Sequence, residues 1–137
     1  MLDRTARLGS SVVVIHAVVV LLHSRAHDDL GVDLNAFQQA FAAAVIVIAP
    51  FVAAALLWGR HQRVGGHLLW MSMAGALVFG VYHHYVAISP DHVAHLPPGD
   101  AQSLFRWTAS LLPVTELAGL LVGVWAARSP AAQRRVG

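Results

Sequence analysis

Four long apolar stretches alternate with short polar segments along this chain. The apolar stretches cover about 8–26, 36–58, 66–88 and 104–127. A helix needs roughly 20 apolar residues to cross a hydrocarbon core of about 30 Å, so each stretch is suited to span a membrane. The pattern therefore predicts an all-α integral membrane protein, a four-transmembrane-helix bundle forming a single domain over 1–137, with outer loops at 27–35 and 89–103.

The first apolar stretch has a second interpretation. Ser24, Arg25 and Ala26 follow it and loosely resemble a signal-peptidase site, so a cleaved export signal must be weighed. His16 lies in the middle of the stretch, which is unusual for the apolar region of a signal peptide. We therefore expect a first membrane helix here.

The arginines indicate how the bundle is oriented. In a four-span arrangement seven of the nine fall on the side of the termini, and only Arg25 and Arg106 fall on the other; the seven are Arg4, Arg7, Arg60, Arg63, Arg128, Arg134 and Arg135. Basic residues favour the cytoplasmic side of membrane proteins. We expect a multi-pass protein of the plasma or inner membrane, with both termini cytoplasmic and both loops outside.

Composition supports the membrane class and narrows the chemistry. The chain is 57% hydrophobic and 12% charged, where a soluble domain carries about 25% charged residues. Cysteine is absent, which excludes disulfides, thiolate metal sites and cysteine nucleophiles. The arginines flank apolar segments and form no stripe, so the lipid bilayer is the expected partner and nucleic acid is not.

Histidines form a line along the first predicted helix. His16, His23 and His27 are spaced by seven and four residues, which places them within about 40° of one another at 100° per residue. The other positions are mostly valine and leucine, so we expect the histidines to face the bundle. An ordinary explanation remains open, in which His23 and His27 are interfacial residues and His16 hydrogen-bonds to a neighbouring helix.

A second group of histidines ends the third predicted helix and continues into the following loop. Odd-numbered spans run in the same direction, so this group can meet the outer end of the first helix. Together the candidate metal ligands are His23, His27, His83, His84, His92, His95 and Asp91, with Tyr82 and Tyr85 as flanking residues that could support them. Imidazole with carboxylate suits copper, zinc or iron. Tyrosines at this depth are also common membrane anchors, and Asp91, after Pro90, is also a typical turn residue.

One carboxyl group lies deep within the fourth apolar stretch. Glu116 follows Pro113 by three residues, and an ionised acid at the centre of a membrane helix is costly. We expect it to face the bundle, either as a neutral group that hydrogen-bonds between helices or as part of an intramembrane relay with His16.

These observations favour one function and leave others open. The favoured function is a small His-rich membrane metalloprotein with a copper, zinc or iron site at the outer face, for redox chemistry or metal handling. The alternatives are a b-type haem protein, a proton or ion conductor using His16 and Glu116, and a structural subunit. Small residues at Ser72, Ala76 and Gly80, and the pair Gly119 and Gly123, would serve association as a homo-oligomer or within a larger complex. The sequence does not decide whether the protein is an enzyme.

Overall fold

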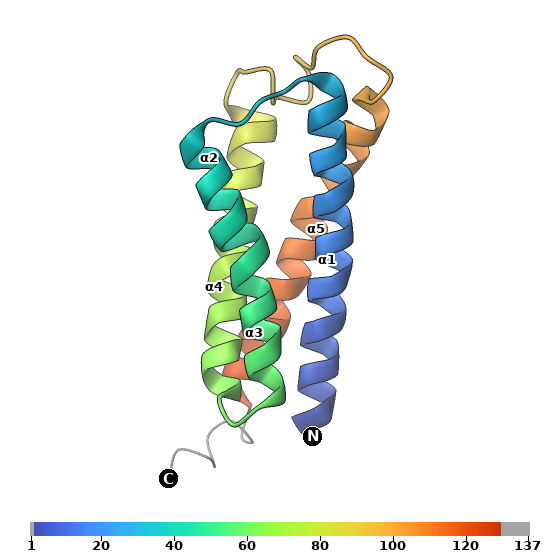
Figure 1. Ribbon diagram of the computed structural model, residues 1–137. Helices are drawn as coiled ribbons and strands as arrows, with labels where there is room; N and C mark the ends of the chain where they lie inside the picture. The colour runs from blue at the N-terminus through green and yellow to red at the C-terminus, as the bar shows by residue number, and fades with distance from the viewer. Residues whose placement is uncertain (1, 130–137) are drawn as a thin grey trace.

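The computed structural model describes residues 2–129 and is 81% helical, with no strand in that range. Four helical spans are long and apolar enough to cross a membrane: Arg4–Leu30, Ala36–Trp58, Gln62–Val86 and Gln102–Arg128. They stand side by side as an elongated bundle (Figure 1). The all-helical prediction and the four spans are confirmed at this level. Arg134 and Arg135, used above to orient the chain, lie outside the described residues.

The helix bounds differ from the predicted ranges in informative ways. Helix α1 covers Leu2–Leu30, so His27 lies in its last turn and not in a loop as expected. The second span is a continuous run of α2 (Ala36–Phe41), η1 (Ala42–Ile48) and α3 (Ala49–Trp58). The third consists of α4 (Gln62–Val81) and η2 (Tyr82–Val86), and the fourth is α5 (Gln102–Arg128).

Two of these segments, η1 and η2, are π-helical. Such wide turns are rare and frequently occur at functional sites. They lie in the same half of the bundle, near the segments 31–35 and 87–101. We call this half the loop end, and the half in which α1 begins and α5 ends the terminal end.

Pro50 lies inside the second span without breaking it. Proline has no amide hydrogen, so the carbonyl of Ile46, four residues earlier, lacks its usual helical donor. His16 lies with its Nε2 atom 3.3 Å from that oxygen. A side chain from α1 thus satisfies the carbonyl that Pro50 leaves unpaired.

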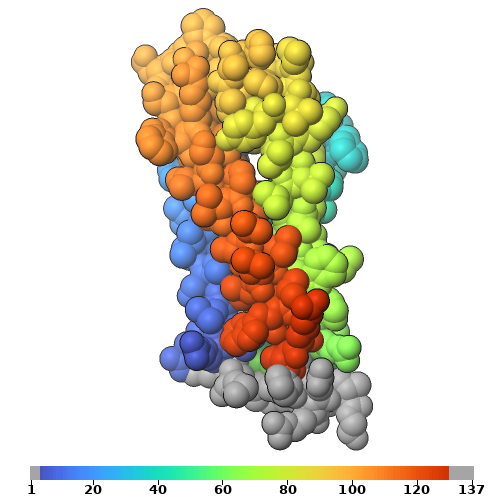
Figure 2. Space-filling view, turned by 180° about the vertical axis from the view of Figure 1, so that it is seen from behind, coloured from blue at the N-terminus to red at the C-terminus, as the bar shows by residue number. Residues whose placement is uncertain are grey.

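Glycines bring α4 and α5 together at the terminal end. A Cβ atom on Gly66 would lie 2.5 Å from the Ala127 amide nitrogen, and one on Gly123 would lie 2.5 Å from that of Trp70. Both distances are far below van der Waals contact, so only glycine allows this backbone approach. The space-filling view shows the two helices joined closely there (Figure 2). The predicted packing motif of Gly119 and Gly123 is therefore used inside the chain, and it gives no support to the predicted homo-oligomer.

A separate apolar core holds the loop end. Buried side chains from α1, the segments 31–35 and 87–101, and α5 meet there, namely Ala26, Leu30, Val32, Leu96, Phe105 and Ala109. This core fixes the last turn of α1 and the first turns of α5 relative to the segment 87–101. The polar side chains described next lie directly against it.

Candidate metal centre

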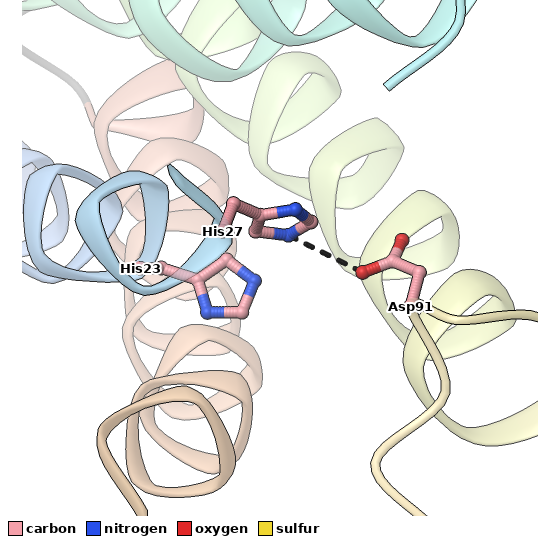
Figure 3. Close-up of side chains that lie close together, drawn as sticks. All are labelled: His23, His27 and Asp91. Carbon is pink, nitrogen blue, oxygen red and sulfur yellow. Dashed lines mark ion pairs between the residues drawn. The ribbon is translucent and has the colours of Figure 1, made fainter. Parts of the chain in front are cut away.

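Four polar side chains from three elements meet at the loop end. His23 and His27 come from α1, His84 from η2, and Asp91 from the segment that follows η2. Their exposed fractions are only 7%, 8%, 6% and 6%. Figure 3 shows the two α1 rings and the Asp91 carboxylate directed toward one another.

The end of α1 determines the orientation of His27. Gly31 has a φ of 63°, a left-handed conformation that favours glycine, and ends the helix. The Gly31 amide donates to the Asp28 carbonyl at 3.2 Å and the Val32 amide to the His27 carbonyl at 3.0 Å. This is a Schellman motif. It folds Val32 back over the helix, and His27 Nδ1 donates to the Val32 carbonyl at 3.0 Å.

His23 is oriented by α5. Its Nδ1 atom lies 2.8 Å from the Thr108 hydroxyl oxygen. Thr108 donates its own proton to main-chain carbonyls of α5, at 2.7 Å to Leu104 and 3.0 Å to Phe105. Because that proton is used, the hydroxyl must accept from His23, and Nδ1 carries the hydrogen.

His84 is oriented by the segment after η2. The Val93 amide donates to the His84 carbonyl at 3.0 Å, which holds this segment against the end of η2. His84 Nδ1 in turn donates to the Asp91 carbonyl at 3.2 Å. A carbonyl can only accept, so this ring also carries its hydrogen on Nδ1.

All three histidines therefore keep a lone pair on Nε2 when they are neutral. The Nε2 atoms of His23 and His84 lie only 3.1 Å apart. His27 Nε2 lies 3.2 Å from Asp91 Oδ1, and His84 Nδ1 lies 3.1 Å from the same oxygen. Although buried, Asp91 Oδ1 accepts no aligned hydrogen bond. The Nε2 lone pairs of neutral His23 and His84 thus face each other, and His27 forms an ion pair with Asp91 when its ring is protonated. A metal ion in place of that proton would stabilise both contacts.

The dimensions of this group suit a small metal ion. One ligand atom each from His23, His27 and Asp91 can be chosen so that all lie within 4.8 Å of one another. A tetrahedral zinc ion with ligands at about 2.0–2.1 Å separates those ligands by about 3.3 Å. The His27–Asp91 separation of 3.2 Å is close to that value, and the other separations within this set do not exceed 4.8 Å.

Asp91 acts both as a turn residue and as a member of the group, so the two interpretations of its sequence position are compatible. Its amide donates to the Ser89 hydroxyl at 3.3 Å, and the His92 amide donates to the Ser89 carbonyl at 3.0 Å. Burial by itself raises the pKa of the Asp91 carboxyl. The nearby imidazoles of His27 and His84 outweigh this effect and hold the pKa well below its ordinary value. The carboxyl is therefore ionised at neutral pH.

Phe105 is part of this site and was not anticipated from the sequence. It is fully buried, and its ring centroid lies 4.6 Å from that of His23, 4.9 Å from His27 and 5.5 Å from His84. The ring supports all three imidazoles from the side of α5. Thr108, three residues later on the same face of α5, supplies the acceptor for His23. The three-residue spacing of Phe105 and Thr108, which puts both on one face of a helix, was the sequence feature that could have identified them.

Other predicted site residues lie apart from the group. His83 points to α2, with Nδ1 3.2 Å from the Gln38 amide nitrogen, and its ring lies against Phe79. His92 and His95 contact each other through their Nδ1 atoms at 3.1 Å. Tyr82 is 53% exposed, and Tyr85, 40% exposed, reaches the Ser110 hydroxyl at 3.2 Å.

The two residues of the predicted relay are both buried, each with 1% exposure. His16 Nδ1 lies 3.1 Å from the Thr115 hydroxyl oxygen, which also lies 2.9 Å from the Leu112 carbonyl oxygen. Glu116 Oε2 is buried without a hydrogen-bond partner. Within residues 2–129, no hydrogen bond or ion pair links Glu116 to His16.

A cavity of about 280 Å³ runs from this metal-ligand group to Glu116. Near its mouth it is lined by Asp28, Asp33 and Leu34, and farther in by the ligand group, with η1 contributing Ala42 and Ile46. Gly80 lies between the two ends. A Cβ atom there would lie 3.9 Å from His84 Cδ2 and 4.0 Å from Glu116 Oε2.

Comparisons with known proteins add no identification. No family model, no curated protein and no solved structure matches this chain. Its function must therefore be argued from the site itself.

Proposed function

We propose that this protein is a multi-pass membrane metalloprotein that binds one transition-metal ion through His23, His27, His84 and Asp91. The metal would be coordinated by three imidazole Nε2 atoms and one carboxylate oxygen. Such a set suits zinc, copper or iron, and the protein would serve redox chemistry or metal handling. Of the seven ligands predicted from the sequence, this proposal keeps four and leaves out His83, His92 and His95.

The single observation that carries the proposal is the direction of the three imidazole hydrogens. Each Nδ1 donates to an oxygen that is not a proposed ligand atom: the Thr108 hydroxyl, the Val32 carbonyl and the main-chain carbonyl of Asp91. In proteins, metal-bound histidine usually donates its second nitrogen to such an oxygen, which fixes the tautomer and strengthens the ligand. Three rings arranged in this way around one buried carboxylate are better explained by a cation than by mutual hydrogen bonding.

The membrane placement rests on length, composition and charge. The terminal end carries Arg4, Arg7, Arg60, Arg63 and Arg128, and the loop end carries Arg25 and Arg106. The positive-inside rule therefore puts the termini in the cytoplasm and the metal site near the outer face. Because the chain has no cysteine, single cysteines at Arg60 and Asp100 would test this arrangement. A membrane-impermeant thiol reagent added to intact cells is expected to label position 100 alone, and labelling of position 60 instead would reverse the orientation.

The metal proposal is tested by elemental analysis of purified protein. After loading with zinc and removal of excess metal, the native chain is expected to retain one ion per molecule. His84→Ala should lose it. His83→Ala is the matched control, because His83 is the neighbouring residue of η2 but lies outside the group. Equal metal content in all three proteins, or none in the native chain, would contradict the proposal.

The haem alternative is not favoured by the geometry. Two axial histidines must lie on opposite faces of a flat macrocycle, with the iron between them. His23 and His84 have Nε2 atoms 3.1 Å apart, which leaves no room for that macrocycle. The same short separation is compatible with two ligands on adjacent corners of one ion.

A further inference from the structure

Among residues 4–129, Glu116 is the one buried carboxyl group that the proposed metal site does not use. Its exposed fraction is 1%, and Oε2 has no hydrogen-bond partner. A buried polar atom without a partner costs free energy, and a carboxylate costs more than a neutral group. The molecule thus maintains an unfavourable group at the inner end of a cavity, which is expected where a ligand supplies the missing partner.

The cavity lining indicates the charge of that ligand. The described residues that line it include four acids, Asp28, Asp33, Asp91 and Glu116, but no arginine, and the chain has no lysine. A ligand carrying a carboxylate or phosphate would meet these acids, and the His27 imidazole is already paired with Asp91. A cation would be attracted at the mouth by Asp28 and Asp33 and could pair with Glu116 at the inner end.

The remaining walls indicate the body of the ligand. Around Glu116 the cavity is lined by Phe79, Leu112 and Ile46, which offer apolar and aromatic surface. A volume of about 280 Å³ is at the lower limit of small-molecule pockets, which span about 300–1,000 Å³. Gly80 keeps the passage between the metal-ligand group and Glu116 open, since a side chain there would occupy it.

We infer that this cavity is a binding site for a small organic amine, with its ammonium group on Glu116 and its apolar body against Phe79, Leu112 and Ile46. The ammonium donates a hydrogen bond to Glu116 Oε2, the carboxylate oxygen that is buried without a partner within the described residues. A bare metal ion at this position would have a single protein carboxylate and apolar walls, which is a poor ligand set. The amine and the proposed metal ion would occupy opposite ends of one cavity, and because both are cations, each is expected to weaken the binding of the other.

The test uses the full chain in detergent after removal of metal by a chelator, so that its result does not depend on the metal site. Benzylamine is the probe, and benzyl alcohol and benzoate are the neutral and anionic comparisons, each followed by calorimetric titration. Benzylamine is expected to bind, and the alcohol and the acid to bind at least tenfold more weakly. Equal binding of benzylamine and benzyl alcohol would overturn the inference, because it would reflect only partition into apolar surface.

Two variants locate the site. Glu116→Gln keeps the shape of the side chain, removes its charge and should weaken benzylamine about 10- to 100-fold, as expected for a hydrogen bond to a charged group. Gly80→Ala should weaken it by filling the passage, and the new methyl group meets neighbours only at ordinary contact distances of 3.9–4.0 Å, so the fold should be retained. Unchanged benzylamine affinity in both variants would overturn the inference, and normal zinc retention in the same variants would show that the metal proposal still holds.

Discussion

The terminal end and the loop end of this bundle are built on opposite principles. At the terminal end, Gly66 and Gly123 let the backbones of α4 and α5 touch beside an apolar core, and the buried polar side chains described there, Thr5, Gln62 and Ser129, belong to no shared cluster of titratable groups. At the loop end, π-helical turns, a cavity and four buried polar side chains replace that close packing. Close packing of helix backbones stabilises the terminal end. At the loop end the packing is less close, and polar side chains are held in fixed orientations. The comparison indicates that function resides at the loop end.

The largest expected effect is a loss of folding stability when one methyl group is added at the terminal end. Gly123→Ala places a Cβ atom 2.5 Å from the Trp70 amide nitrogen and 3.0 Å from the Gly66 carbonyl oxygen, and neither backbone atom can move away easily. The expected loss is about 3 kcal/mol of unfolding free energy, the upper part of the usual range for overpacking. It can be measured by thermal unfolding in detergent, followed by circular dichroism. A loss below about 0.5 kcal/mol would show that the helices are not in backbone contact.

A smaller effect, on zinc affinity, is expected when the hydroxyl that contacts His23 Nδ1 is removed. Thr108→Val keeps the side-chain shape but removes the acceptor for His23 Nδ1, so the ring can move its hydrogen to Nε2 and lose the ligand lone pair. Zinc affinity should fall about 10- to 100-fold. Thr115→Val is the matched control, because it removes a threonine hydroxyl that contacts His16, outside the ligand group. If both variants bind zinc equally well, the orientation of His23 does not matter to binding.

The Asp91 carboxylate should make stability depend on pH in the metal-free protein. Its pKa in the folded chain lies below the unfolded value of about 3.9, so ionisation stabilises the fold. That contribution is complete above about pH 4 and disappears as the pH falls further, through the native pKa. The difference in unfolding midpoint between the native chain and Asp91→Asn should therefore be largest at about pH 5, below the ordinary histidine pKa of about 6.5, and should shrink below pH 4. A difference that persists unchanged at pH 2.5 would rule out this coupling.

The smallest expected effect is the change in folding stability when a methyl group is added at the loop end. Gly80→Ala meets no atom closer than 3.9 Å, and alanine is favoured over glycine inside a helix by roughly 0.5–1 kcal/mol. This variant should be as stable as the native chain or slightly more stable. Its contrast with Gly123→Ala, measured under the same detergent conditions, is the direct comparison of the two ends. A loss similar to that of Gly123→Ala would mean that the cavity beside Gly80 is closed.

The sequence predicted the four spans and part of the site because both depend on local periodicity. Hydrophobic length located the spans, and helical spacing placed His23 and His27 on a common face of α1. The level of His84 followed from counting residues along two helices that run in the same direction. The single-domain organisation and the membrane orientation remain predictions.

The features of the site that could not be predicted from the sequence depend on irregular backbone conformation. The choice between His83 and His84 depends on the π-helical turn η2, which changes the direction of each side chain and has no clear sequence signature. The sequence predicts His27 in the loop 27–35, whereas α1 continues to Leu30 and Gly31 ends it. His92 and His95 share a loop whose course is set by contacts such as the hydrogen bond from Arg106 to the Val93 carbonyl at 3.1 Å. Their distance from the metal-ligand group could not be derived from spacing alone.

The most direct test of the proposed metal site is nitrogen NMR of the protein with ¹⁵N-labelled histidine, recorded before and after addition of one equivalent of zinc. Zinc is diamagnetic, and the two ring nitrogens give separate signals whose shifts report protonation and coordination. Our account predicts that three of the nine histidines respond, that each responds at Nε2, and that each keeps its hydrogen on Nδ1. The three signals should be assigned to His23, His27 and His84 by single alanine variants. Coordination through Nδ1, or a response confined to His83, His92 and His95, would contradict the account.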